Sequence, residues 1–180
     1  METRLIRLFV IVGNDKKGIH CLATRRPFEK LELLGGQVND IWDDAQAEIK
    51  VLKKSDVVIS APSSKVYIGG LISPQYFEDK GLFDLVFMQV ISIENIDIFD
   101  KDKVIKVYLS RINEYKFMHP RMKSIAEVGM LLYSGNTKKA RKILLPGEKI
   151  IIGPHFIDKG VLYGLREFGE KPNIYNIKGN

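Results

Sequence analysis

The sequence has little cysteine and histidine, and it has no long apolar run. Cys21 is the only cysteine among 180 residues, which excludes an intramolecular disulfide and a zinc site built from cysteine pairs. The three histidines, His20, His119 and His155, are far apart and lack metal-ligand spacing. No apolar run approaches the roughly 20 residues of a membrane-spanning helix, and the start lacks the apolar core of a signal peptide. We therefore expect a cytoplasmic chain without integral membrane association.

What the sequence has in excess is positive charge. It contains 28 Lys and Arg against 22 Asp and Glu, which gives a formal net charge of +6 and a pI near 9.3. Such a surface attracts anions, so nucleic acid, an anionic membrane or an acidic protein are the partner classes that it favours. The hydrophobic fraction of 45% is ordinary for a globular protein and excludes wholesale disorder.

The apolar pattern predicts one mixed α/β (α+β) domain with a mixed sheet, strand-rich in its N-terminal half. Strand-like runs occur at residues 5–12, 19–23, 56–61, 66–72 and 82–93. Of these, 82–93 is the longest apolar run and is the predicted central strand. Residues 74–80 predict a short helix or loop.

Helices are predicted mainly in the C-terminal half. Asp100 can cap a helix in which apolar residues recur at helical spacing up to Ile112. Pro120 suits the first turn of a second helix that ends near Gly135, and residues 149–152 predict a further strand. We expect a single globular domain over residues 1–168, followed by a loosely ordered polar tail over 169–180.

An acidic run that ends in Glu-Ile-Lys occupies residues 39–50. If residues 37–42 and 46–52 pair around a three-residue loop, Asp40 lies opposite Glu48, and Lys50 projects to the same face. Carboxylate oxygens bind hard divalent cations such as Mg²⁺, which lower the pKa of a bound water. Lys50 can orient that water or stabilise charge on a phosphate. The segment therefore predicts a metal-dependent hydrolytic site.

Other interpretations of the same segment stay open. Amphipathic hairpins often expose Glu and Lys as ordinary cross-strand pairs, and a four-residue loop would place Asp40 on the opposite face. Apolar residues from Phe28 to Trp42 also recur at helical spacing, interrupted only by Gly35 and Gly36.

The run NDIWDDAQAEIK resembles the active-site segment of PD-(D/E)XK type II restriction endonucleases, with a PvuII-like motif. The resemblance covers roughly residues 37–113 and implies a metal-dependent endonuclease that hydrolyses DNA phosphodiester bonds. It implies Asp40 and Glu48 as metal ligands, Lys50 as the water-orienting lysine and Mg²⁺ as the cofactor. The hairpin is shorter than in the closest comparison, and Gln37 stands where an acid often precedes the motif.

Two groups of basic residues are the predicted nucleic-acid contacts, because each Lys or Arg can pair with a phosphate. The residues are Arg25, Arg26, Lys138, Lys139, Arg141 and Lys142. The predicted partner is nucleic acid, DNA by the resemblance, and a homodimer stays open. The alternative function is a non-enzymatic basic binding or assembly protein, viral matrix-like or nucleoprotein-associated.

Overall fold

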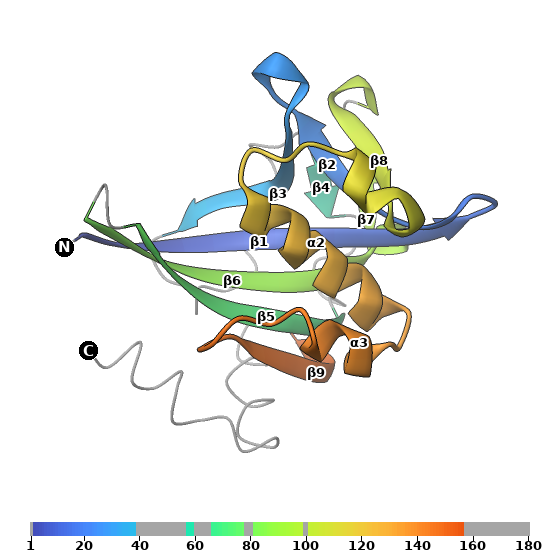
Figure 1. Cartoon of the computed structure of the whole chain (residues 1–180). Helices are drawn as coiled ribbons and strands as arrows, with labels where there is room; N and C mark the ends of the chain where they lie inside the picture. Colours follow the sequence, from blue (N-terminus) through green and yellow to red (C-terminus); the bar gives the residue numbers. More distant parts are fainter. Residues whose placement is uncertain (1, 39–56, 60–65, 78–80, 99–100, 157–180) are drawn as a thin grey trace.

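The fold is built on a seven-stranded mixed sheet with one face covered by helix α2 (Pro120–Tyr133), as Figure 1 shows. The computed structural model describes residues 2–38, 57–59, 66–77, 81–98 and 101–156. The sheet strands are β1 (Glu2–Asp15), β2 (Gly18–Arg25), β3 (Leu31–Val38), β5 (Val66–Phe77), β6 (Leu82–Ser92), β8 (Val104–Tyr108) and β9 (Lys149–Phe156). The remaining elements are the short strands β4 (Val57–Ile59) and β7 (Ile96–Ile98), helix α3 (Thr137–Arg141) and 3-10 turns at Pro27–Glu29, Ile93–Asn95, Lys101–Lys103 and Leu109–Glu114.

The strands follow the order β8-β2-β3-β1-β6-β5-β9, with β1 in the middle. Strands β1 and β6 run parallel, in register from Glu2 opposite Leu82 to Val12 opposite Ser92. The other neighbours in this sheet pair antiparallel, and β4 and β7 pair antiparallel with each other. The chain therefore has an α+β, single-domain fold, strand-rich at first and helical mainly in its second half.

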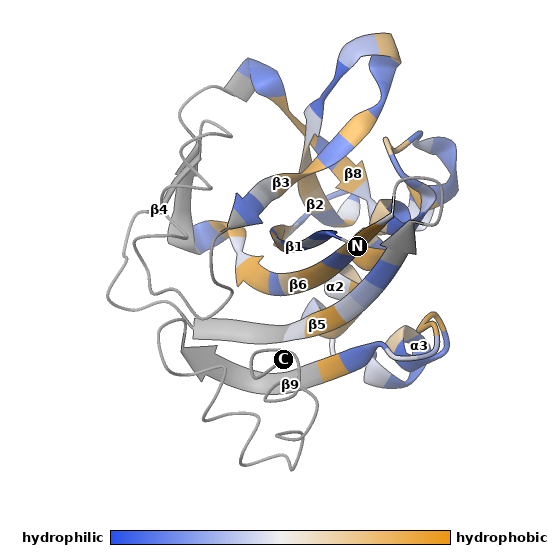
Figure 2. Ribbon diagram, turned by 90° about the vertical axis from the view of Figure 1, so that its left-hand side faces the viewer, coloured by the Kyte–Doolittle hydropathy of each residue, from blue (hydrophilic) through white to orange (hydrophobic). Residues whose placement is uncertain are grey.

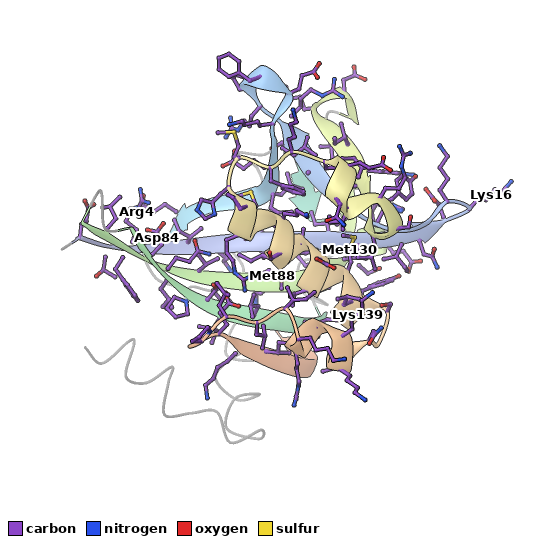
Figure 3. All side chains as sticks on the ribbon, in the orientation of Figure 1. Arg4, Lys16, Asp84, Met88, Met130 and Lys139 are labelled. Atoms are coloured by element: carbon purple, nitrogen blue, oxygen red, sulfur yellow. The ribbon has the colours of Figure 1, made fainter. Side chains whose placement is uncertain are left out.

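Helix α2 packs on the sheet through an apolar core. Pro120 opens the helix where its missing N–H costs nothing, and Gly135, with φ of 78°, follows its end. Met130 of α2 and Met88 of β6 are both fully buried in this core (Figure 3). Figure 2 shows hydrophobic stretches along β6, β2 and β8. Since each buried side chain of this size contributes about 1.5–3 kcal/mol, this core holds the helix against the sheet.

The opposite face of the sheet is also buried. Alternation along β1 and β6 places Phe9 and Phe87 on this face, and both are almost inaccessible. Between them lies Arg7, with its guanidinium carbon 5.9 Å from each ring centroid. Its Nε donates to Oε1 of Gln89 over 2.8 Å. The charge of Arg7 is thus held inside the protein by aromatic rings and an amide.

The structure confirms the predicted strands at 5–12, 19–23, 66–72, 82–93 and 149–152 and the helix that begins at Pro120. The predicted short helix or loop at 74–80 is wrong where it is described, because β5 continues to Phe77. The helix predicted from Asp100 to Ile112 is also wrong. Val104, Ile105 and Val107 are β-branched and pair with β2 as strand β8, and a 3-10 turn follows.

Candidate functional site

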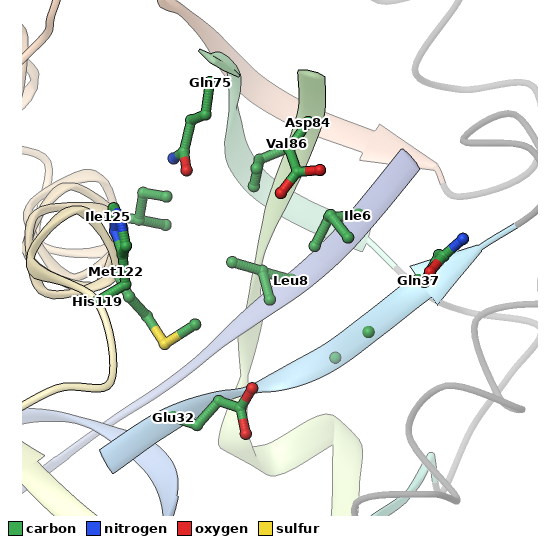
Figure 4. Close-up of a pocket in the computed structure, with 12 residues that line it drawn as sticks. Ile6, Leu8, Glu32, Gln37, Gln75, Asp84, Val86, His119, Met122 and Ile125 are labelled. Atoms are coloured by element: carbon green, nitrogen blue, oxygen red, sulfur yellow. The ribbon is translucent and has the colours of Figure 1, made fainter. Parts of the chain in front are cut away.

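A pocket of about 310 Å³ lies between the start of α2 and the middle strands of the sheet (Figure 4). This volume is within the range of small-molecule sites. Its apolar lining comes from β1, β6 and α2 and consists of Ile6, Leu8, Val86, Met122 and Ile125. Its polar lining comes from β3, β5, β6 and the residue before α2 and consists of Glu32, Gln37, Gln75, Asp84 and His119.

The periodicity of the elements decides which side chains reach the pocket. Ile6 and Leu8 are two positions apart on β1 and line the pocket, whereas Arg7 between them lies on the other face. On the helix side, Met122 and Ile125 are three residues apart and lie on one face of α2, and His119 precedes the helix as its N-cap. The pocket is therefore formed where a strand face and a helix face meet.

The β3 wall of the pocket carries two glycines. Gly35 has a φ of 143°, and a Cβ built on it would lie 2.2 Å from the backbone oxygen of Arg7. No L side chain fits there, because the obstacle is backbone of the neighbouring strand. Gly36 has nothing within 4 Å of a built Cβ. The two residues leave this wall without side chains, so a ligand can approach the backbone of β3 directly.

Asp84 is the most deeply buried of the polar lining residues, with 6% of its surface exposed. Both of its oxygens accept from Arg4: Oδ1 from Nε over 2.8 Å and Oδ2 from Nη2 over 2.9 Å (Figure 3). These bonds raise the pKa of the Arg4 guanidinium. The planar fork of arginine holds the carboxylate in a single orientation.

Glu32 is the second carboxylate of the pocket, and it pairs with Arg26 at the end of β2. His119 stands at the N-cap of α2, where its Nδ1 accepts from the backbone N–H of Arg121 over 3.1 Å. A neutral His119 that accepts through Nδ1 carries its proton on Nε2. The ring can therefore donate through Nε2.

A buried ion pair fixes the start of α2 beside the pocket. Nε of Arg121 donates to Oε1 of Glu148 over 2.8 Å, Nη2 of Arg121 pairs with the other oxygen, and Ser73 Oγ donates to Oε1 over 2.6 Å. The side chain of Glu148 is 1% exposed and that of Arg121 is 10% exposed. Helix α2, the loop before β9 and strand β5 are thus joined at Ser73, two positions before the lining residue Gln75.

The described residues do not form a metal site by themselves. They contain no group of three or more His, Cys, Asp or Glu side chains that could hold a metal ion. Within the pocket, the oxygens of Asp84 accept from Arg4, and Glu32 is paired with Arg26. A divalent cation at this site would need carboxylates from elsewhere in the chain.

The sequence-predicted catalytic set, Asp40, Glu48 and Lys50, lies outside the described residues, as does most of its predicted hairpin. The described part of that region is strand β3, which ends at Val38. The alternative of a continuous helix from Phe28 to Trp42 is therefore wrong across residues 31–38.

The predicted nucleic-acid contacts do not form one surface. Arg25 and Arg26 lie at the end of β2, near one edge of the sheet, whereas Lys138, Lys139 and Arg141 lie on α3, beside β9 at the other edge (Figure 1). Arg26 is already paired with Glu32. Lys142 follows α3 as its C-cap.

Sequence reasoning missed Gln75, Asp84 and His119. One signal for Asp84 was present, because it is the charged residue inside the apolar run LFDLVF, and a charge in a buried strand needs a partner. Gln75 and His119 gave no such signal, since each belongs to a segment that the sequence alone leaves ambiguous.

No protein-family model matches this sequence, and no curated protein matches it. Solved structures do match the fold. The E. coli ORF135 protein superposes with a TM-score of 0.51 at 14% identity, over 75% of this chain and 94% of that one. A NUDIX hydrolase from Nitrosomonas europaea superposes with a TM-score of 0.50 at 14% identity, over 76% of this chain and 91% of that one. The chain has a Nudix-like fold.

This likeness corrects the resemblance to PD-(D/E)XK restriction endonucleases, which is wrong. A short acidic motif can occur in unrelated folds, and the arrangement of the sheet and α2 matches the Nudix type instead. The predictions of a DNA endonuclease and of a nucleic-acid-binding or assembly protein are not retained with it. No described helix is long and apolar enough to cross a membrane.

Proposed function

We propose that this chain is a Mg²⁺-dependent hydrolase that cleaves the phosphoanhydride bond of a nucleoside-diphosphate-containing compound. The observation that carries the proposal is the pocket of about 310 Å³ between α2 and the sheet, in a fold shared with a NUDIX hydrolase. The pocket has apolar walls and a few polar groups from separate elements, which is the usual composition of a small-molecule site.

The metal ligands belong to the proposal as well. Strand β3 lines the pocket with Gly35, Gly36 and Gln37, and the acidic run follows directly in the sequence. Asp40 comes two positions after Val38, and two residues span at most about 7 Å. We therefore assign Asp40 as a candidate ligand, together with Glu48 of the same acidic run. A Mg²⁺ ion would supply charge neutralisation at the phosphates and a water of lowered pKa.

The residues of the chain have separate roles in this proposal. The pocket binds the non-phosphate end of the substrate between the strand face and α2. The side-chain-free wall at Gly35 leaves room for the rest of the substrate to pass along β3. Lys50, at the end of the acidic run, is the candidate cation for the phosphate charge.

The test is hydrolysis of nucleoside diphosphates, nucleoside triphosphates and nucleoside-diphosphate sugars by the purified chain, followed as nucleoside monophosphate on an anion-exchange column. We expect product with Mg²⁺ and none with a chelator. Asp40→Asn and Glu48→Gln should each lower the rate by at least about 10-fold, the loss that even an outer-shell change can cause. Asp43→Asn removes the same charge from the same acidic run and should keep the activity. An absence of product from every substrate with Mg²⁺ or Mn²⁺ would refute the proposal.

A further inference from the structure

Four cations on and just after α3 take no part in the pocket between α2 and the sheet. They are all exposed, and no ion pair in the described part of the chain includes any of them. The sequence has no Asp or Glu between Glu127 and Glu148, so no carboxylate of this segment offsets their charge. We call these residues the α3 basic face, and they are Lys138, Lys139, Arg141 and Lys142.

Spacing by three residues separates the inner side chains of this segment from the outer ones. Beyond α3, the backbone N–H groups of Lys142 and Ile143 donate to the carbonyls three residues earlier, at Lys139 and Ala140. Side chains three positions apart overlie one another in such a turn. Ala140 is buried and Ile143 packs against the core, so these two form the inner row. Lys139 and Lys142 form an outer row, and Leu145, which is 53% exposed, follows at the same spacing.

Hydrogen bonds hold this segment in place at both ends. Oδ1 of Asn136 accepts from the backbone N–H of Lys139 over 3.2 Å and caps the start of α3. At the other end, the backbone N–H of Leu145 donates to Oε2 of the buried Glu148 over 2.9 Å. A partner that binds the α3 basic face therefore does not have to order this backbone first.

The α3 basic face lies at the edge of the sheet beside β9, on the outside of the fold (Figure 1). Its residues line neither the pocket of about 310 Å³ nor a second described pocket, of about 410 Å³, near Phe28. Three of its four cations are lysines, which are hydrated point charges without the fork that holds one anion bidentately. Such a face attracts an extended anionic surface through its summed charge, whereas it lacks directed bonds for a single small ligand.

We propose that the α3 basic face docks the protein on an anionic lipid bilayer, a role beyond the proposed function and independent of it. The four cations lie at the level of the headgroups, and the side chain of Leu145 enters the boundary between headgroups and acyl chains. Each Lys or Arg near such a bilayer favours binding by roughly 5-fold, so four of them together favour it by roughly several hundred-fold. This attraction requires no geometric match, which suits cations that are held in no ion pair.

Leu145 favours a bilayer over other polyanions. Its exposed part can be buried at the acyl boundary while the neighbouring cations stay among the headgroups, and charge attraction combined with apolar burial anchors peripheral proteins. The phosphate backbone of a nucleic acid presents charge without an apolar layer, so the exposed leucine would gain nothing there.

The test is co-sedimentation of the full chain with vesicles of phosphatidylcholine alone or with about 30% phosphatidylserine, at about 0.1 M salt, where the Debye length is about 10 Å. We expect binding only to the vesicles that contain phosphatidylserine. At about 1 M salt, where the Debye length falls to about 3 Å, this binding should be lost. Replacing all four cations of the α3 basic face by glutamine should lower the partition coefficient by about 100-fold or more. Leu145→Ser should lower it by about 3-fold or more, because it removes the apolar contact.

The matched control also replaces four exposed lysines by glutamine, so it removes the same charge from other parts of the fold. These lysines are Lys16, Lys17, Lys30 and Lys116. Binding should stay within about 3-fold of the parent, because charges more than a Debye length from the bilayer are screened. A thermal unfolding curve for each variant separates lost binding from lost folding, and the dependence of the parent protein on lipid and salt needs no variant.

Four results would overturn the inference. The parent protein does not bind vesicles with phosphatidylserine, or it binds both kinds of vesicle equally. The control variant loses as much binding as the variant of the α3 basic face, or the latter is folded and binds like the parent. Binding of a duplex oligonucleotide or of polyglutamate through this face, without binding to the vesicles, would assign the face to a different polyanion and overturn the inference as well.

Discussion

Replacing Gly129 by alanine tests how closely α2 packs against the sheet. In the middle of a helix, alanine is favoured over glycine by about 1 kcal/mol, so the substitution should stabilise α2 taken alone. In the structure, however, a Cβ on Gly129 would lie 2.6 Å from Cγ1, 2.7 Å from Cβ and 2.8 Å from Cγ2 of Val10. A rotation of Val10 cannot relieve the contact, because its own Cβ is among the overlapping atoms.

The magnitude follows from these two opposing effects. Inserting a methyl group into a packed core costs about 1–3 kcal/mol. Because only backbone movement can relieve this overlap, we expect a cost in the upper part of that range, about 2–3 kcal/mol. After the propensity gain of about 1 kcal/mol, Gly129→Ala should lower the free energy of unfolding by about 1–2 kcal/mol. In a Val10→Gly background all three overlapping atoms are absent, and the same substitution should stabilise by up to about 1 kcal/mol.

The assay is a double-mutant cycle of urea unfolding curves for the four proteins. The expected coupling energy between the two positions is about 2–3 kcal/mol, in the range found for residues in contact. A Gly129→Ala protein as stable as the parent would refute this account of the helix contact. So would a coupling energy within about 0.5 kcal/mol of zero, the limit of additivity for independent sites.

Three further predictions concern other parts of the molecule. Burial raises the pKa of the Cys21 thiol to about 12, so a thiol reagent at pH 8 should label the denatured protein and spare the native one. Glu148→Ala should lower the free energy of unfolding by about 3–5 kcal/mol in chemical denaturation, because it leaves a buried arginine without its partner, whereas Glu114→Ala, which breaks an exposed pair, should change it little. Hydrogen bonds, foremost from Lys106, lower the pKa of Asp15 below the ordinary carboxyl value of about 4. Asp15 therefore stabilises the fold at pH values above that ordinary value, and this stabilisation is lost as the pH falls from there towards the lowered pKa. Asp15→Asn should therefore reduce the acid sensitivity of the thermal midpoint, and an unchanged acid profile would contradict this assignment.

Local patterns in the sequence were sufficient for much of the fold. Runs of β-branched and aromatic residues predicted the central strands β1 and β6, because such side chains suit a buried, pleated surface. Pro120 and Gly135 predicted the limits of α2, because their backbone preferences are local properties. The helical spacing of apolar residues before Ile112 predicted a helix that the structure does not have, because pairing of β8 with β2 outweighs a weak periodicity.

Function was beyond the sequence for a physical reason. A short acidic motif shows which chemical groups are present, and this one resembled the active-site segment of a nuclease. It does not determine the fold in which these groups lie. The parallel register of β1 and β6 brings Ile6 and Val86 to one pocket wall, although 80 residues separate them. The pairing of β5 with β6 places Gln75 beside Asp84. By itself the sequence determined composition, charge and most of the elements, whereas the tertiary structure decided the pocket, since a pocket consists of contacts between distant segments that no local pattern encodes.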